Sequence, residues 1–175
     1  KMVTGNKGED PAAADRTKKL WAALVGAESG VLARSATGQP LDKMAAPVRL
    51  NIKSGESYQR IDLLRALLVK SPNDVARCLA RDNAGSIEAF AERMNKRADE
   101  LGMTKSHFTN PWGKEDPRHY STARDMGRLA RWVIETYPEC YKYFGEREFT
   151  CDKISQSNRN PLLGMNIGAD GRKTG

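Results

Sequence analysis

The sequence lacks any hydrophobic run near the roughly 18 consecutive apolar residues that a membrane-spanning helix needs. Its first seven residues also lack the apolar core of a secretory signal. If the protein is exported, we expect the signal and any membrane anchor to lie in segments outside this sequence. The 175 residues, 39% hydrophobic and 29% charged, are typical of a folded globular chain, and we expect one domain over residues 1–175.

Potential metal ligands are scarce. The sequence has two histidines, His107 and His119, and three cysteines, Cys78, Cys140 and Cys151, with no C-x-x-C pair. This spacing does not support a zinc site, and no metal is expected. Cys140 and Cys151 are the nearer pair for one disulfide, but buried free thiols are the preferred interpretation.

The net charge of +7 does not come from a basic run. A basic surface can hold nucleic acid, an anionic membrane or an acidic polymer. Here the basic residues alternate with acidic ones, as in residues 77–82 and 93–100, which is typical of scattered solvated charge. We expect no nucleic-acid partner; the alternative predicts salt-dependent retention on DNA.

The hydrophobic pattern predicts a mainly helical chain with strands at its margins. Alternating apolar and polar residues predict strands at 48–52 and 147–151, and Gly, Ser and Pro predict loops at 29–47 and 103–120. Helices are predicted where apolar residues recur at helical spacing: from Asp10-Pro11, over 61–68, from Ser71-Pro72, from Ser86 to Gly102, and from Thr122 to Pro138. The positions expected to face inward are Val75, Ala76, Leu79, Ala80, Phe90, Met94, Ala98, Leu101, Met126, Leu129, Ala130, Val133 and Ile134.

Three short segments are candidates for chemistry, although each is weak alone. Ser71-Pro72-Asn73 before Asp74 is also typical of a plain helix N-terminus. Lys173-Thr174-Gly175 is a tripeptide that occurs by chance. Lys1, followed by Met-Val-Thr, has the alternative of being an arbitrary N-terminal lysine.

Taken together with the segments between them, these motifs form an ordered series. The series consists of the segments Leu63–Lys70, Ser71–Asp74, Gly85–Phe90, Met94-Asn95, Leu101–Met103, His107-Phe108, Ser121–Met126, Asn158–Leu163 and Gly168–Gly175. It resembles the low-molecular-mass penicillin-binding proteins of the serine-type D-alanyl-D-alanine carboxypeptidase family. The resemblance covers about residues 47–175, whereas residues 5–46 match poorly.

The resemblance implies an α+β fold of the serine β-lactamase and penicillin-binding-protein type, of which this chain would supply mostly the α-helical subdomain with a few short strands. It implies removal of the terminal D-alanine of a peptidoglycan pentapeptide through an acyl-serine intermediate, and acylation of the same serine by β-lactams. Such chemistry needs a nucleophile, a base and oxyanion donors, but no metal or organic cofactor. The family acts in the periplasm or elsewhere outside the cytoplasmic membrane, and membrane association would come only from segments not in this chain.

The resemblance also implies roles for individual residues. Ser71 and Asn73 would form the S-x-N motif, whose serine relays protons and whose asparagine binds a substrate amide. Lys173, Thr174 and Gly175 would form the K-T-G motif that holds the substrate's carboxylate.

Two further assignments are less direct. Lys1 would be the lysine of S-x-x-K, and Arg159 matches a segment near the cleft, with a polar turn as its alternative. The nucleophilic serine would then lie three positions before Lys1, because no serine in this sequence has a lysine three residues later. Two other functions stay open: a catalytically inactive fragment or binding module, and a β-lactamase-related hydrolase. The S-x-N form and the absence of an evident deacylating glutamate motif argue against the hydrolase.

Overall fold

A computed structural model describes residues 32–44, 48–151, 154–158 and 160–165. Within these ranges helices predominate, which confirms the expected helix-rich chain with a few short strands. In chain order the elements are β1 (Ser35–Thr37), the 3-10 helix η1 (Pro40–Met44), β2 (Ser57–Gln59), α2 (Arg60–Val69), α3 (Asn73–Ala84), α4 (Ile87–Glu100), α5 (Ala123–Thr136), α6 (Pro138–Tyr141), the 3-10 helix η2 (Lys142–Gly145), β3 (Glu148–Cys151), β4 (Ile154–Ser157) and the 3-10 helix η3 (Pro161–Gly164).

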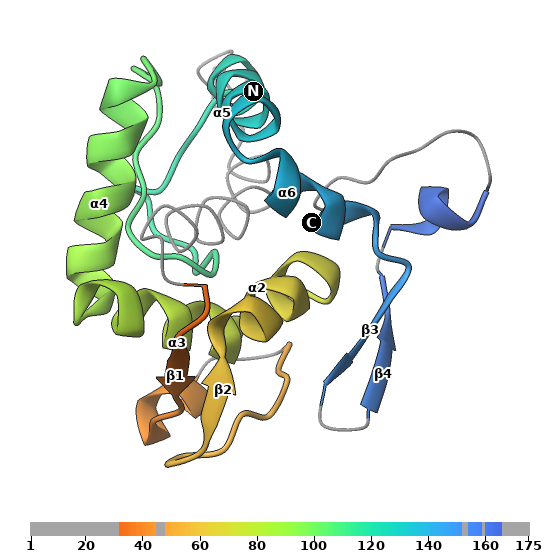
Figure 1. Ribbon diagram of the computed structural model, residues 1–175. Helices are drawn as coiled ribbons and strands as arrows, with labels where there is room; N and C mark the ends of the chain where they lie inside the picture. Colours follow the sequence, from red (N-terminus) through yellow and green to blue (C-terminus); the bar gives the residue numbers. More distant parts are fainter. Residues whose placement is uncertain (1–31, 45–47, 152–153, 159, 166–175) are drawn as a thin grey trace, which may run out of the picture.

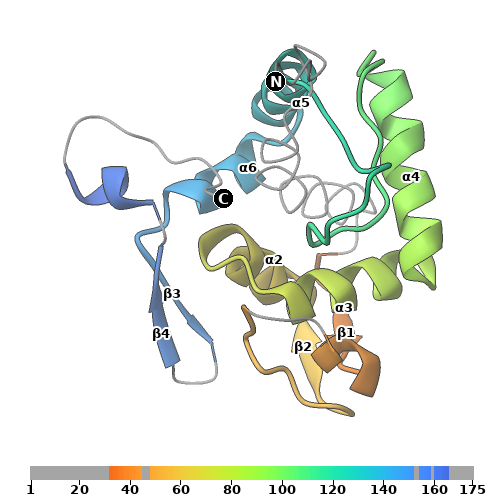
Figure 2. The same ribbon diagram turned by 180° about the vertical axis from the view of Figure 1, so that it is seen from behind.

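Helix α2 lies at the centre of the described part, with a small antiparallel strand pair on either side of it (Figures 1 and 2). One pair joins β1 to β2, with Ser35 opposite Gln59. The other joins β3 to β4, with Glu148 opposite Ser157, and its strand β3 packs against α2. Helix α3 packs against α2 and leads into α4 at a sharp angle.

The predicted helix ends at α4 and α5 are confirmed. The Ser86 hydroxyl accepts the Ala89 N–H, and the Thr122 hydroxyl accepts the Asp125 N–H, so each satisfies an unpaired donor of the first turn. Helix α4 ends with Gly102 at φ 68°, a left-handed conformation that glycine adopts without a Cβ clash. The Gly102 N–H donates to the Asp99 carbonyl, which closes the last turn.

The core forms around α2, whose residues are buried on nearly every face. A helix that is apolar all round is stable only when other elements enclose it, and α3 and the η2–β3 segment do so here. The residues predicted to face inward on α3 are all buried, as are three of the four predicted for α4. The largest fully buried side chains are Phe90, Phe108, Ile52, Leu63, Leu67, Met94, Met103 and Leu129.

The strand predicted over residues 48–52 is wrong. These residues belong to no strand, and Asn51 has a left-handed φ of 62° that is incompatible with one. The N–H groups of Leu50, Asn51 and Ile52 donate to the buried side chain of Asp74 instead of to a neighbouring strand. The strand at 147–151 is confirmed as β3.

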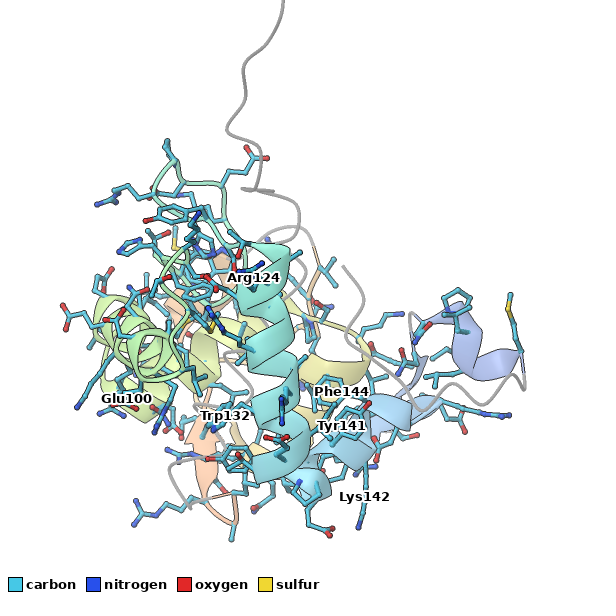
Figure 3. All side chains as sticks on the ribbon, turned by 90° about the horizontal axis from the view of Figure 1, so that it is seen from above. Glu100, Arg124, Trp132, Tyr141, Lys142 and Phe144 are labelled. Carbon is cyan, nitrogen blue, oxygen red and sulfur yellow. The ribbon has the colours of Figure 1, made fainter. Side chains whose placement is uncertain are left out.

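Helix α5 buries a narrower stripe than the sequence predicts. Leu129 and Val133 are buried, but Ile134 is 43% exposed because α5 lies at the edge of the described part and contacts the rest through one side. Trp132 points from α5 toward α4, where the Arg97 guanidinium lies over its ring (Figure 3). Pro138 does not merely end α5: it occupies the first turn of α6.

The preferred interpretation of the cysteines is confirmed at the two that the structure describes fully. Cys78 and Cys140 are buried and free, so the alternative disulfide between Cys140 and Cys151 is wrong. Burial raises the pKa of the Cys78 thiol to about 12, and the nearby carboxylate of Asp42 adds to the effect.

Cys78 is therefore expected to resist alkylation by iodoacetamide at pH 8 in the folded protein and to react after unfolding in urea, because the thiolate is the nucleophile. The raised pKa also makes the free energy of unfolding depend on pH. The stability that the neutral Cys78 thiol contributes to the folded protein is fully present below the unfolded thiol's pKa of about 8.5, and it is lost progressively as pH rises from there through about 12. Mass spectrometry after timed exposure to iodoacetamide measures how far folding protects Cys78 from alkylation. Equal alkylation rates in the folded and unfolded protein would contradict it.

Candidate functional site

The candidate site residues that the structure describes lie at the tight turn between α2 and α3. Ser71 has φ 66°, a left-handed conformation that a residue with a Cβ seldom adopts. Its N–H donates to the Ala66 carbonyl at 3.3 Å, so the turn folds back on the last turn of α2. Ser71 is 4% exposed and Asn73 is 7% exposed, so the turn is packed on most sides. The backbone of the predicted S-x-N motif thus lies in a tight, buried turn.

The alternative that Ser71 is a helix cap is wrong. Helix α3 begins at Asn73 with Pro72 in the cap position, and no side chain caps it. The reason is conformational: a capping residue has extended backbone angles, whereas Ser71 is left-handed. The Ser71 side chain is therefore positioned by the turn and not by the needs of the helix.

Asp74 is the residue of this region whose importance the sequence analysis missed. Its carboxylate is fully buried and accepts four backbone N–H groups. Oδ1 accepts from Leu50 at 3.0 Å and from Val75 at 2.9 Å. Oδ2 accepts from Asn51 at 2.8 Å and from Ile52 at 3.2 Å. The only sequence signal is an aspartate directly after S-x-N, which is equally typical of a helix first turn.

The loop over residues 103–120 lies beside α3 and is held by side chains. The Arg77 guanidinium lies 4.6 Å from the ring centroid of Trp112, a cation–π contact that ties the loop to α3. The side-chain Oδ1 of Asn110 accepts the N–H groups of Gly113 and Lys114, both at 2.8 Å. Trp112 therefore anchors the loop to α3.

The segment around Arg159 is described only through its neighbours. The Asn158 amide donates to the Phe144 and Glu146 carbonyls at 3.3 and 2.8 Å, and its oxygen accepts the Asn160 N–H at 2.9 Å. These bonds form a polar turn that fixes the base of the β3–β4 hairpin.

The other predicted site residues, namely Lys1, Arg159, Lys173, Thr174 and Gly175, lie outside the described residues. The structure therefore brings together Ser71 and Asn73 only. An approach of the Lys173 ammonium to Ser71 across a common cleft stays a prediction.

Within the described ranges, no group of three or more His, Cys, Asp or Glu side chains is placed to hold a metal ion. Among the described helices, none is both long and apolar enough to cross a membrane.

Comparison with known proteins gives a consistent result. Penicillin binding protein 5 from Haemophilus influenzae superposes with a TM-score of 0.87 at 31% identity, covering 99% of this chain and 52% of that chain. The helix-rich fold is thus that of a penicillin-binding protein. The family model described as D-alanyl-D-alanine carboxypeptidase matches residues 28–175. The chain belongs to the D-alanyl-D-alanine carboxypeptidase family.

Curated relatives agree with this membership. The D-alanyl-D-alanine carboxypeptidase DacA of Haemophilus influenzae is 44% identical over 115 residues, which are 65% of this chain and 29% of that protein. DacC of Escherichia coli is 40% identical over 141 residues, which are 80% of this chain and 35% of that protein. The chain therefore spans about a third of the length of these curated relatives.

Proposed function

We propose that the full-length protein carrying this chain is a serine-type D-Ala-D-Ala carboxypeptidase that removes the terminal D-alanine of peptidoglycan stem peptides. The observation that carries the proposal is the family match over residues 28–175, in which Ser71 and Asn73 occupy a rigid, buried turn. We place the activity outside the cytoplasmic membrane, where the substrate occurs, with β-lactams as covalent inhibitors.

In the proposed reaction a serine hydroxyl attacks the carbonyl carbon between the two D-alanines. The bond to the terminal D-alanine nitrogen breaks, an acyl-serine ester forms, and water then hydrolyses that ester. The Ser71 hydroxyl would pass a proton to the leaving nitrogen, and the Asn73 amide would hold the substrate's peptide group. Both roles need fixed positions, because general acid–base transfer requires atoms within hydrogen-bond reach.

The K-T-G motif would supply the remaining substrate contacts. Lys173, Thr174 and Gly175 would hold the terminal carboxylate that distinguishes a D-Ala-D-Ala end from an internal peptide bond. Lys1 would be the base beside the nucleophile, and Arg159 would help shape the cleft. No metal or organic cofactor takes part in this proposal.

A fluorescent penicillin tests the proposal on the full-length protein. We expect covalent labelling that survives denaturing electrophoresis, together with release of D-alanine from a pentapeptide. The 175-residue chain alone is expected to stay unlabelled, because none of its serines has a lysine three residues later. Absence of labelling in the full-length protein would favour an inactive binding module. Rapid turnover of a chromogenic β-lactam without D-alanine release would favour a β-lactamase-related hydrolase.

A further inference from the structure

We propose that Asp74 is a positioning residue for the S-x-N motif, and that it sets the geometry of Ser71 and Asn73 from inside the fold. The inference rests on the proposed function, because it assigns a role in the same reaction. Asp74 is not expected to touch substrate, since its carboxylate is fully buried.

The first argument is how the Asp74 carboxylate is satisfied. Three of its four donors are the consecutive N–H groups of Leu50, Asn51 and Ile52, which converge on the two oxygens. Successive N–H groups that converge around a left-handed residue make a concave anion-binding site, and Asn51 has that conformation. The protein's own Asp74 occupies this site, so the carboxylate joins the 48–52 segment to the first turn of α3. Hydrogen bonds to an ionised group are about twice as strong as neutral ones.

The second argument is that the same segment also binds the neighbouring motif residue. The Asn73 N–H donates to the Val48 carbonyl at 2.7 Å. Asn73 and Asp74 are consecutive residues of α3, and both hydrogen-bond to the backbone of the five-residue segment 48–52. If the Asp74 bonds weaken, the stretch shifts, and the backbone of Asn73 shifts with it.

The third argument is strain. Asn51 and Ser71 are the non-glycine residues with positive φ among those described; Asn51 donates its N–H to Asp74, and Ser71 precedes Asp74 by three positions. Such conformations are strained and persist only where the surroundings enforce them. The Asp74 carboxylate accepts the N–H of Asn51 directly and also accepts the Val75 N–H within the first turn of α3, which begins at Asn73. It thereby stabilises the conformation that aims the Ser71 hydroxyl.

The test compares two buried aspartates of the full-length protein. Asp74→Asn removes the charge at nearly constant size and leaves one acceptor oxygen. Asp42→Asn is the matched control. Asp42 is also buried (2% exposed), accepts a loop N–H from Gln39 at 2.8 Å, and contacts α3 through Arg81 at 2.8 Å, near the other end of that helix. Both variants are assayed below their unfolding transitions for the rate constant of acylation by a fluorescent penicillin.

We expect D74N to acylate about 10- to 100-fold more slowly than wild type, because a misplacement of about 1 Å can lower a rate by this much. D42N is expected to acylate at the wild-type rate although it lowers the melting temperature. Equal acylation by D74N and D42N would overturn the positioning role. If D74N does not fold, Asp74→Glu keeps the charge but displaces it by one methylene. Wild-type acylation by D74E would overturn the role as well. An unlabelled wild type, by contrast, would refute the proposed function itself.

Discussion

Replacing Ser71 by alanine in the full-length protein is expected to lower the rate constant for acylation by a fluorescent penicillin by about 10²- to 10⁴-fold, the usual contribution of a positioned proton-transfer group. Alanine keeps the Cβ and therefore the left-handed strain, so the free energy of unfolding should change little. Time courses of labelling on denaturing gels measure the acylation rate constant, and urea unfolding measures the free energy of unfolding.

Ser121→Ala is the matched control for Ser71→Ala. Ser121 is also a buried serine, and its hydroxyl lies 2.8 Å from the Ser106 hydroxyl, so alanine at this position removes a hydrogen bond to the 103–120 loop. Because Ser121 supports the 103–120 loop and has no predicted chemical role, S121A should lower the free energy of unfolding, unlike S71A, and acylate normally. If S71A acylates at the rate of S121A, Ser71 is only a turn residue.

The second large effect concerns stability. Phe90→Ala on α4 is expected to lower the free energy of unfolding by about 3–5 kcal/mol, because it removes a fully buried aromatic side chain and leaves a cavity. Urea unfolding followed by tryptophan fluorescence measures the change.

Ile134→Ala provides the comparison for Phe90→Ala. Ile134 is 43% exposed on α5, so its truncation removes little buried surface and should lower stability by about 0.5 kcal/mol or less. A loss for I134A as large as that for F90A would mean that Ile134 is covered in the folded protein, as the sequence pattern predicts.

The elements that the sequence predicted correctly are those whose signals are local. Ser86 and Thr122 cap their helices because the cap bond joins residues three apart, and the apolar spacing of Phe90, Met94 and Ala98 defines one face of α4 without reference to the rest of the fold. Helix α2 was predicted because a short, continuous apolar run can only be buried.

The elements that the sequence missed depend on distant partners. Residues 48–52 alternate like a strand, but their N–H groups bond to a side chain more than 20 positions away. Ile134 continues the apolar stripe of α5, yet burial depends on which neighbours reach that side. The left-handed conformation of Ser71 also has no local signal, because serine gives no preference for it.

At the candidate site the sequence indicated the motif residues but not the residue that holds them. Ser71 and Asn73 are recognised by resemblance, since their side chains belong to a motif with a known chemical logic. Asp74 belongs to no such motif, and its proposed role can be seen only in the fold, where the 48–52 segment lies against α3.

The left-handed turn at Ser71 has a consequence for how this protein can be improved or can evolve. Glycine would adopt the same φ without strain, so a screen that rewards heat resistance alone should enrich Ser71→Gly and Asn51→Gly. Only the first of these would remove a hydroxyl needed for the proposed chemistry. At Ser71 the glycine that raises thermal stability therefore lowers turnover, whereas at Asn51 it leaves turnover unchanged. Variants recovered from such a screen would show which positions the protein keeps strained because its reaction requires them.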